Sequence, residues 1–201
     1  IVMKLVNDKE LNLDQPISEF FPGFYKSGKD TITIRHLLIH ESGLSAYHRY
    51  FLENKYKGRG DVLENIIKRR LTYQPGTEYK YSDLGMILLG TILERIGGNN
   101  LHALGSEWFY SPLEMKNTFY NPTANQWKNI PPTERTVIPI GTSKTSFKRE
   151  IANLSTRIFG PMKTLSYDLF PKQTAHGYVH DENANLLGGI SAHAGLFSNA
   201  E

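Results

Sequence analysis

The sequence predicts a chain made mainly of helices and loops, with too few strand patterns to build an independent sheet. Residues 84–96 are apolar on nearly every side, which is typical of a helix that runs through the middle of a domain. Residues 121–175 combine scattered prolines with Ser, Thr and Lys clusters and little periodicity, which indicates long irregular connections. Alternating apolar and polar residues, the pattern of a half-buried strand, do not form runs long enough to add a sheet.

The first elements of the chain are expected to be short. Apolar residues at helical spacing predict a helix over 1–6, and the polar residues that follow end it. The residue before Pro16 is biased away from the helical region, so an extended turn is expected there. Thr33 is suited to cap a second short helix, and Gly43 is suited to end it in the left-handed conformation.

Two longer helices are predicted next. Asp61 and Glu64 have the spacing of a capping box at the start of an apolar stripe that extends to residue 71. After a Pro-Gly turn, the apolar run 84–96 forms the second helix, and Gly97-Gly98 closes it. Because this run has no polar face, we expect the helix to be buried.

We expect one domain over residues 1–201, a length that corresponds to about one domain. Its parts are a mainly helical section over 1–120, an irregular loop region over 121–175 and a glycine-rich segment over 176–201. The chain opens on Ile1 within a helical pattern and lacks the positive region and cleavage site of a signal sequence. We therefore expect a shortened form of a larger domain.

Composition excludes several classes of protein. The 23 basic and 20 acidic side chains give a net charge of only +3 and are spread along the chain, so no nucleic-acid partner is expected. No apolar run approaches the roughly 20 residues that cross a bilayer, so no transmembrane segment is expected. The chain has no cysteine, which excludes thiolate metal sites, disulfides and a cysteine nucleophile. We expect no cofactor.

Three histidines near the C-terminus raise the alternative of a metal-dependent hydrolase. His176 and His180 are four residues apart, and His193 follows downstream. The glycine and aromatic residues between them do not suit a rigid ligand helix, so hydrogen-bonded loop histidines and no metal are the main expectation. The stretch 189–193 also nearly matches the G-x-S-x-G nucleophile elbow, but His193 replaces the second glycine.

Two segments remain as candidates for function. Tyr81 precedes the buried helix, so its hydroxyl is expected at the edge of a cavity. Ser82 or Asp83 is expected to point into the same space, near the positive end of the helix. The alternative, an aromatic anchor followed by an ordinary helix cap, stays open. In the second segment, the density of glycines and small residues over 188–195 indicates backbone packed closely against a neighbour.

At these residues the chain resembles the serine β-lactamase and DD-peptidase superfamily, which includes class C β-lactamases, penicillin-binding proteins and family VIII-type esterases. The strings at 132–134 and 179–184 are similar to the branch with a periplasmic DD-carboxypeptidase-type penicillin-binding protein. Four stretches carry the resemblance in the family's order: Ile1–Pro22, Thr33–Leu44, Pro75–Gly97 and Gly188–Ala200.

The resemblance implies an α/β (α+β) β-lactamase/transpeptidase-like fold, of which this chain is mainly the helical domain, with part of the antiparallel sheet missing. The residues 176–201 are then a wall of the active site. Of the family's three motifs only the second is present, as Tyr81-Ser82-Asp83, with Asp83 in place of the usual Asn. The resemblance assigns catalytic roles to Tyr81 and Asp83, and Ser82 is a candidate for substrate binding.

The function implied is that of a serine hydrolase fragment, which acts through an acyl-enzyme on a peptide, a β-lactam or an ester. The chain has no Ser-x-x-Lys and lacks the third motif, so it is expected to be inactive alone. The alternative is a non-catalytic module of the same fold that binds peptidoglycan or a partner. The expected ligand is a small molecule or a peptidoglycan peptide, self-association through exposed sheet or helix surface is expected, and the location is periplasmic or otherwise extracytoplasmic.

Overall fold

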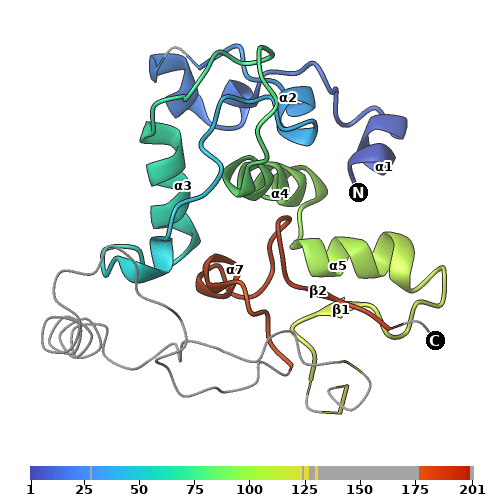
Figure 1. Cartoon of the computed structure of the whole chain (residues 1–201). Helices are drawn as coiled ribbons and strands as arrows, with labels where there is room; N and C mark the ends of the chain where they lie inside the picture. The colour runs from blue at the N-terminus through green and yellow to red at the C-terminus, as the bar shows by residue number, and fades with distance from the viewer. Residues whose placement is uncertain (28, 124, 127–129, 131–176, 200–201) are drawn as a thin grey trace, which may run out of the picture.

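The computed structural model describes residues 1–27, 29–123, 125–126, 130 and 177–199 (Figure 1). The predicted irregular region 121–175 therefore lies almost entirely outside the described residues, and so does His176. The described part is mainly helix and loop, which confirms the expected balance of elements.

The centre of the molecule is the helix α4 (Asp83–Gly97), which α2, α3 and α5 contact (Figure 1). Its buried side chains belong to one core cluster that also draws residues from the first 66 positions of the chain. Leu84, Leu88 and Ile92 are fully buried, as expected for a helix that is apolar on nearly every side. Gly98 then ends the helix in the left-handed conformation, with φ +70°. The prediction of a buried helix over 84–96 is confirmed.

The N-terminal residues form short helices that cover one side of α4. These are α1 (Val2–Asn7), two 3-10 turns and α2 (Ile34–Leu38). Thr33 caps α2 as predicted: its hydroxyl accepts from the His36 N–H at 3.3 Å, and His36 Nδ1 accepts from the Thr33 N–H at 3.2 Å. The 3-10 turns are η1 (Ile17–Glu19) and η2 (Pro22–Ser27).

The end of α2 differs from the prediction, which placed it at Gly43. The helix stops at Leu38, because His40 already adopts the left-handed conformation with φ +59°. Gly43 is also left-handed, but it lies in the loop that follows.

The start of α3 (Arg59–Lys68) also differs from the prediction. The helix begins two residues before Asp61, its N-cap is Gly58, and no side chain caps it. The carboxylate of Asp61 instead accepts from the Lys57 N–H at 2.7 Å, and Glu64 pairs with Lys68 one turn along. The predicted capping box is therefore wrong, because both acidic side chains have nearer donors.

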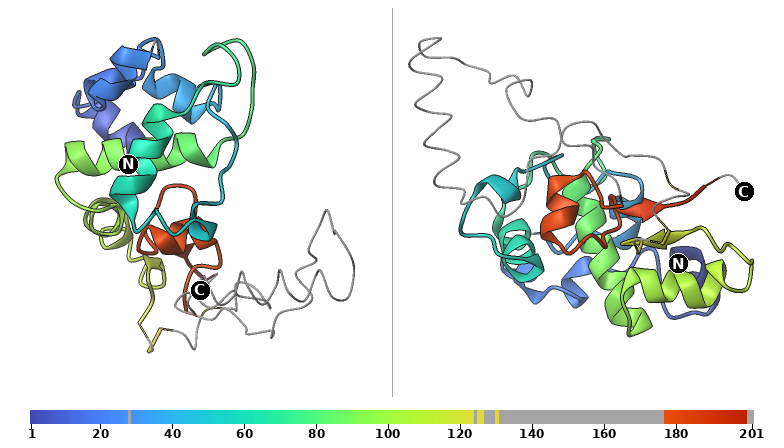
Figure 2. Two further views of the ribbon diagram at one scale, coloured as in Figure 1. Left: turned by 90° about the vertical axis from the view of Figure 1, so that its left-hand side faces the viewer. Right: turned by 90° about the horizontal axis from the view of Figure 1, so that it is seen from below.

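The remaining elements lie on the other side of α4 (Figure 2). α5 (Leu101–Gly105) continues into a π-helical turn, η4 (Ser106–Tyr110), and the short turn η3 (Tyr50–Leu52) contacts α7 (Glu182–Leu186). The one sheet in the described residues pairs β1 (Phe119–Tyr120) antiparallel with β2 (Leu196–Phe197). No helix in these ranges is long and apolar enough to cross a membrane.

Candidate active site

The N-terminal end of α4 carries the three residues that the sequence singled out. Ser82 is the N-cap: its hydroxyl accepts from the Gly85 N–H at 3.1 Å and donates to the Ser45 carbonyl at 2.9 Å. Only 1% of Ser82 is exposed. Its hydroxyl is therefore engaged in the helix cap, and the substrate contact expected from the sequence stays a prediction.

Because Ser82 caps the helix, the neighbouring carboxylate is left for other contacts. Asp83 is the first residue of α4, half-buried, and its N–H donates to the Ala46 carbonyl at 2.9 Å. Its carboxylate lies close enough to the Tyr81 phenol for each group to affect the pKa of the other. Burial raises the pKa of Asp83, and the negative charge of Asp181 adds to this, while His193 and the Tyr81 phenol oppose it.

The phenol of Tyr81 stands at the mouth of α4, where the sequence placed it. The residue is 54% exposed, and its ring lies against the His40 ring with 4.6 Å between centroids. Partial burial and the negative charge of Asp83 raise the pKa of Tyr81. The phenol is therefore protonated at neutral pH. A cation near its oxygen must lower the pKa of Tyr81 before the phenol can lose its own proton and act as a base.

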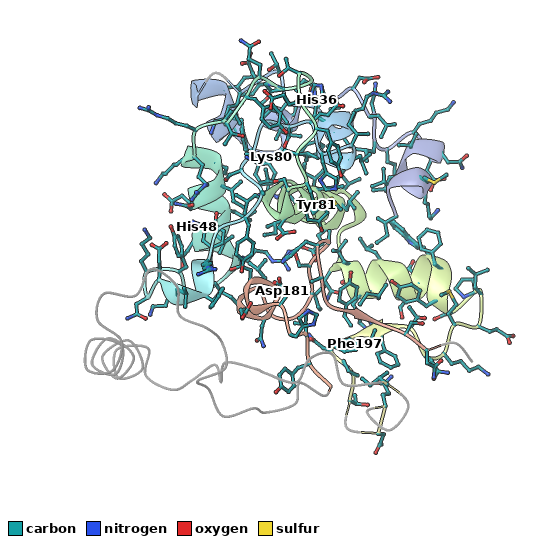
Figure 3. The ribbon with its side chains drawn as sticks, in the orientation of Figure 1. His36, His48, Lys80, Tyr81, Asp181 and Phe197 are labelled. Carbon is teal, nitrogen blue, oxygen red and sulfur yellow. The ribbon has the colours of Figure 1, made fainter. Side chains whose placement is uncertain are left out.

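The glycine-rich segment contributes a second set of polar groups. His193 Nε2 lies 3.1 Å from Asp181 Oδ1, and His193 Nδ1 lies 2.7 Å from the Ser191 hydroxyl. In Figure 3, Tyr81 lies at α4 and Asp181 at the start of α7. Burial alone would raise the pKa of Asp181, but hydrogen bonds from His193 and from the Ala184 N–H lower it overall.

The Asp181–His193–Ser191 chain connects the residue types of a hydrolase triad, but its surroundings do not suit a nucleophile. Ser191 is 3% exposed, and the His193 side chain is 1% exposed. A substrate carbonyl has no path to the Ser191 hydroxyl among the described residues, so the chain anchors the segment. This agrees with the rejection of a nucleophile elbow at 189–193.

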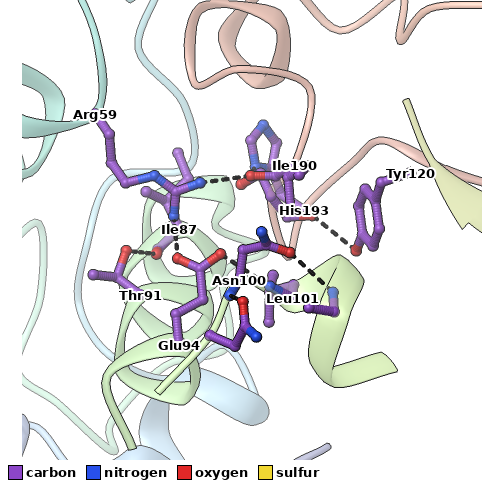
Figure 4. A network of polar contacts seen from close by, with 12 residues as sticks. Arg59, Ile87, Thr91, Glu94, Asn100, Leu101, Tyr120, Ile190 and His193 are labelled. Atoms are coloured by element: carbon purple, nitrogen blue, oxygen red, sulfur yellow. Dashed lines mark hydrogen bonds and ion pairs between the residues drawn. The ribbon is translucent and has the colours of Figure 1, made fainter. Parts of the chain in front are cut away.

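A polar network holds the same segment against the helices (Figure 4). The Arg59 guanidinium pairs with Glu94 of α4 at 2.6 Å and donates to the Ile190 carbonyl at 2.7 Å. The Tyr120 hydroxyl donates to the Ser191 carbonyl at 3.3 Å. Donors from α3 and β1 thus bind two neighbouring carbonyls, and Glu94 of α4 holds the Arg59 guanidinium in place.

Close packing explains the glycines of this segment, as the sequence indicated. A Cβ on Gly90 of α4 would lie 2.9 Å from the Ala192 methyl group, so the two backbones approach closely. A Cβ on Gly189, where φ is +78°, would lie 2.0 Å from Asn121 Oδ1, so a larger residue would be strained there and would have to displace that side chain.

The three-histidine metal hypothesis receives no support from the described residues, which hold no group of three or more metal-ligating side chains. His193 is committed to Asp181 and Ser191. His176 lies outside the described residues.

Sequence reasoning missed the part played by His40, which it included only within the range Thr33–Leu44 that carries the resemblance. It also missed the pairing of Asp181 with His193. The segments 33–44 and 179–184, which contain His40 and Asp181, were noted only as parts of the resemblance. The contact between Asp181 and His193 joins loop residues 12 positions apart, which follows no helical or strand period.

The family model described as "Beta-lactamase" matches residues 1–201. An N-acetylmuramyl-L-alanine amidase of Bacillus subtilis (strain 168) is 34% identical to the chain, covering 100% of the chain and 44% of the amidase. An Escherichia coli (strain K12) protein provisionally named D-alanyl-D-alanine carboxypeptidase is 32% identical, covering 98% of the chain and 44% of that protein. The chain therefore spans less than half the length of these curated relatives.

A solved structure, a beta-lactamase/D-alanine carboxypeptidase from Yersinia pestis complexed with citrate, superposes with a TM-score of 0.54 at 27% identity. The superposition covers 63% of the chain and 38% of that structure. The likeness supports a β-lactamase/transpeptidase-like fold, to which the residues described here contribute mostly helices and little sheet.

Proposed function

The chain belongs to the beta-lactamase family, and we propose that it forms part of a serine hydrolase that cleaves an amide bond of a peptidoglycan-derived peptide. The observation that carries this proposal is Tyr81 at the mouth of α4, half exposed, with its ring against His40 and its phenol near enough to Asp83 to affect the pKa of that carboxylate. The names of the two curated relatives, an amidase and a carboxypeptidase, favour an amide over a β-lactam or an ester as the physiological substrate.

The proposed chemistry needs a nucleophile that these residues do not supply. The sequence contains no Ser followed three residues later by Lys, so we propose that both groups come from outside residues 1–201 in the complete gene product. The positive charge of the lysine ammonium then lowers the pKa of Tyr81, so that the phenol loses its proton to solvent before the reaction begins. Such a cation has access to the phenol, because more than half of Tyr81 is exposed.

In the proposed reaction Tyr81 moves one proton twice. Its phenolate takes the proton of the serine hydroxyl while the serine oxygen bonds to the substrate carbonyl carbon. It then returns that proton to the leaving amine as the C–N bond breaks, which leaves an acyl-enzyme for water to hydrolyse. Before that step, while Tyr81 is protonated, the Asp83 carboxylate can accept from its hydroxyl and orient the ring, although an ionised carboxylate cannot donate to a substrate carbonyl.

A second candidate function is a non-catalytic module of the same fold that binds peptidoglycan or a protein partner. The absence of Ser-x-x-Lys from these 201 residues favours it. The two candidates differ in one respect: only the hydrolase has a serine and a lysine positioned to meet Tyr81 in the complete gene product.

Because peptidoglycan lies outside the cytoplasmic membrane, the proposed substrate places the protein in an extracytoplasmic compartment. We also propose that the 201-residue chain associates with itself. Exposed apolar residues such as Met3, Leu113 and Leu196 support this, and light scattering should then give more than the monomer mass.

The experiment that tests the hydrolase proposal compares substrates on the complete gene product. We expect hydrolysis of a muramyl peptide or a D-Ala-D-Ala peptide to exceed that of nitrocefin and of a p-nitrophenyl ester. A fluorophosphonate should label one serine outside residues 1–201, identified by peptide mapping. The 201-residue chain alone should show no mass shift with the same reagent. Labelling of Ser191, or no labelling of the complete product, would reject the proposal and favour the binding module.

A further inference from the structure

The residue after α2 has an unusual conformation for its type. His40 has φ +59° and follows the helix at the position where glycine is most common. Its N–H donates to the Leu37 carbonyl at 3.3 Å, and the Glu41 N–H donates to the His36 carbonyl at 2.8 Å. These two bonds form a Schellman motif, in which a histidine carries a cost that glycine would avoid.

The same motif ends α1, where the side chain has a different environment. Lys9 has φ +62°, its N–H donates to the Val6 carbonyl at 3.1 Å, and the Glu10 N–H donates to the Leu5 carbonyl at 2.8 Å. Lys9 is exposed to solvent. The two ends thus share one backbone geometry, and the side chain is what distinguishes them.

The His40 side chain and carbonyl contact four consecutive residues. Tyr79 meets the His40 ring edge-on with 6.0 Å between centroids, and the Lys80 N–H donates to the His40 carbonyl at 2.8 Å. The Tyr81 ring lies against the imidazole at 4.6 Å with 43° between planes. The Ser82 N–H then donates to His40 Nδ1 at 3.3 Å. His40 therefore contacts every residue from 79 to 82.

These contacts fix both the backbone and the ring of the tyrosine. The two backbone hydrogen bonds are on the residues immediately before and after Tyr81, so they set the direction in which its side chain leaves the chain. The ring contact then restricts rotation of the phenol about its own side-chain bonds. Because Nδ1 accepts a hydrogen bond, the neutral imidazole carries its proton on Nε2.

We propose that His40 is a positioning residue for Tyr81, which places the phenolic oxygen where a nucleophile from another part of the protein can reach it. The inference rests on the proposed function for its catalytic consequence, and on the contacts alone for its structural one. It also accounts for the use of histidine at a position that suits glycine, since glycine would lose both the acceptor and the ring.

The test replaces His40 in the complete gene product and reads two properties. His40→Gly keeps the left-handed backbone and removes the side chain, while His40→Asn keeps an acceptor oxygen and tolerance for positive φ but removes the ring. Lys9→Gly is the matched control, because it relaxes the same motif at the end of α1. The readouts are the ring-proton chemical shifts of Tyr81, assigned with Tyr81→Phe, and kcat and KM measured separately.

We expect His40→Gly to melt at or above the wild-type temperature while its Tyr81 ring shifts move toward exposed-tyrosine values. Its kcat should fall by about 10- to 100-fold with KM changed by less than about 3-fold, the range for a misplaced catalytic group. His40→Asn should lose the ring-current shift and retain more kcat than His40→Gly. Lys9→Gly should leave both readouts unchanged.

Wild-type Tyr81 shifts in His40→Gly would overturn the inference, as would an equal loss of kcat in Lys9→Gly. A wild-type complete product without hydrolase activity would instead reject the proposed function. In that case the Tyr81 shifts would still decide whether His40 positions the ring.

Discussion

The N-terminal ends of α4 and α7 face similar requirements and meet them with different residues. In α4 the N-cap is Ser82, and the acidic residue follows as Asp83. In α7 the acidic residue is itself the cap: Asp181 Oδ1 accepts from the Ala184 N–H at 2.6 Å and also from His193. A hydroxyl cap thus leaves the Asp83 carboxylate out of the cap and near Tyr81, whereas Oδ1 of Asp181 holds both the α7 cap and His193.

The two carboxylates also differ in their acidity for this reason. Burial raises the pKa of Asp83, and the lowering influence of His193 and of the Tyr81 phenol does not offset it. Burial acts on Asp181 in the same direction, but donors from His193 and Ala184 lower the pKa of Asp181 below its ordinary value. Pairs of titratable groups with opposite shifts are a recurring feature of acid–base sites. Here the difference separates a candidate catalytic carboxylate from a structural one.

The largest effect on stability is expected at the α7 end. Asp181→Ala removes the helix cap and leaves the buried His193 without its carboxylate, so the free energy of unfolding should fall by about 2–4 kcal/mol. Urea denaturation at neutral pH measures this loss. A change below about 0.5 kcal/mol would mean that the anchor contributes little and that the two helix ends are alike.

At the α4 end the corresponding substitution is Ser82→Ala. It removes the cap of the central helix and leaves the Ser45 carbonyl without its donor, which should cost about 1–2 kcal/mol. A substrate-binding role for Ser82 predicts instead a higher KM with little loss of stability. Thermal denaturation and KM of the complete product therefore distinguish the two roles.

The comparison is sharpened by the pH dependence of two asparagine variants. Because the pKa of Asp83 is raised in the folded protein, wild-type stability falls as pH rises from the ordinary aspartate range through that raised value. At neutral pH, Asp83→Asn should therefore be more stable than wild type, by less than about 1 kcal/mol. Because the pKa of Asp181 is lowered in the folded protein, its ionised carboxylate stabilises the fold at pH values above the ordinary aspartate pKa. This stabilisation is lost as pH falls through the lowered pKa.

Melting temperatures of wild type, Asp83→Asn and Asp181→Asn across acid to neutral pH test these opposite signs. The advantage of Asp83→Asn and the deficit of Asp181→Asn should both shrink toward acid pH. Parallel profiles for the two variants would mean that the carboxylates share one environment.

Local signals predicted α4 and the Thr33 cap well, since an apolar run and a capping residue act on their own neighbours. They failed at the end of α2, because glycine is the usual signal there and His40 took its place. They also failed for Arg59, which joins α3 to Glu94 and Ile190 across 35 and 131 positions. Contacts of this kind depend on the folded arrangement, which no short pattern in the sequence encodes.

The central claim is that Tyr81 moves the proton of the nucleophile. Its most direct test is the rate at which a labelled penicillin acylates the complete gene product, or a labelled fluorophosphonate phosphonylates it, measured by intact mass for wild type, Tyr81→Phe and Tyr25→Phe. Tyr25 is 56% exposed against 54% for Tyr81, which makes it a matched control. The account predicts an acylation rate about 10²–10⁴-fold lower in Tyr81→Phe alone, with an unchanged fold. Equal rates in all three proteins would contradict it and leave Tyr81 a packing residue.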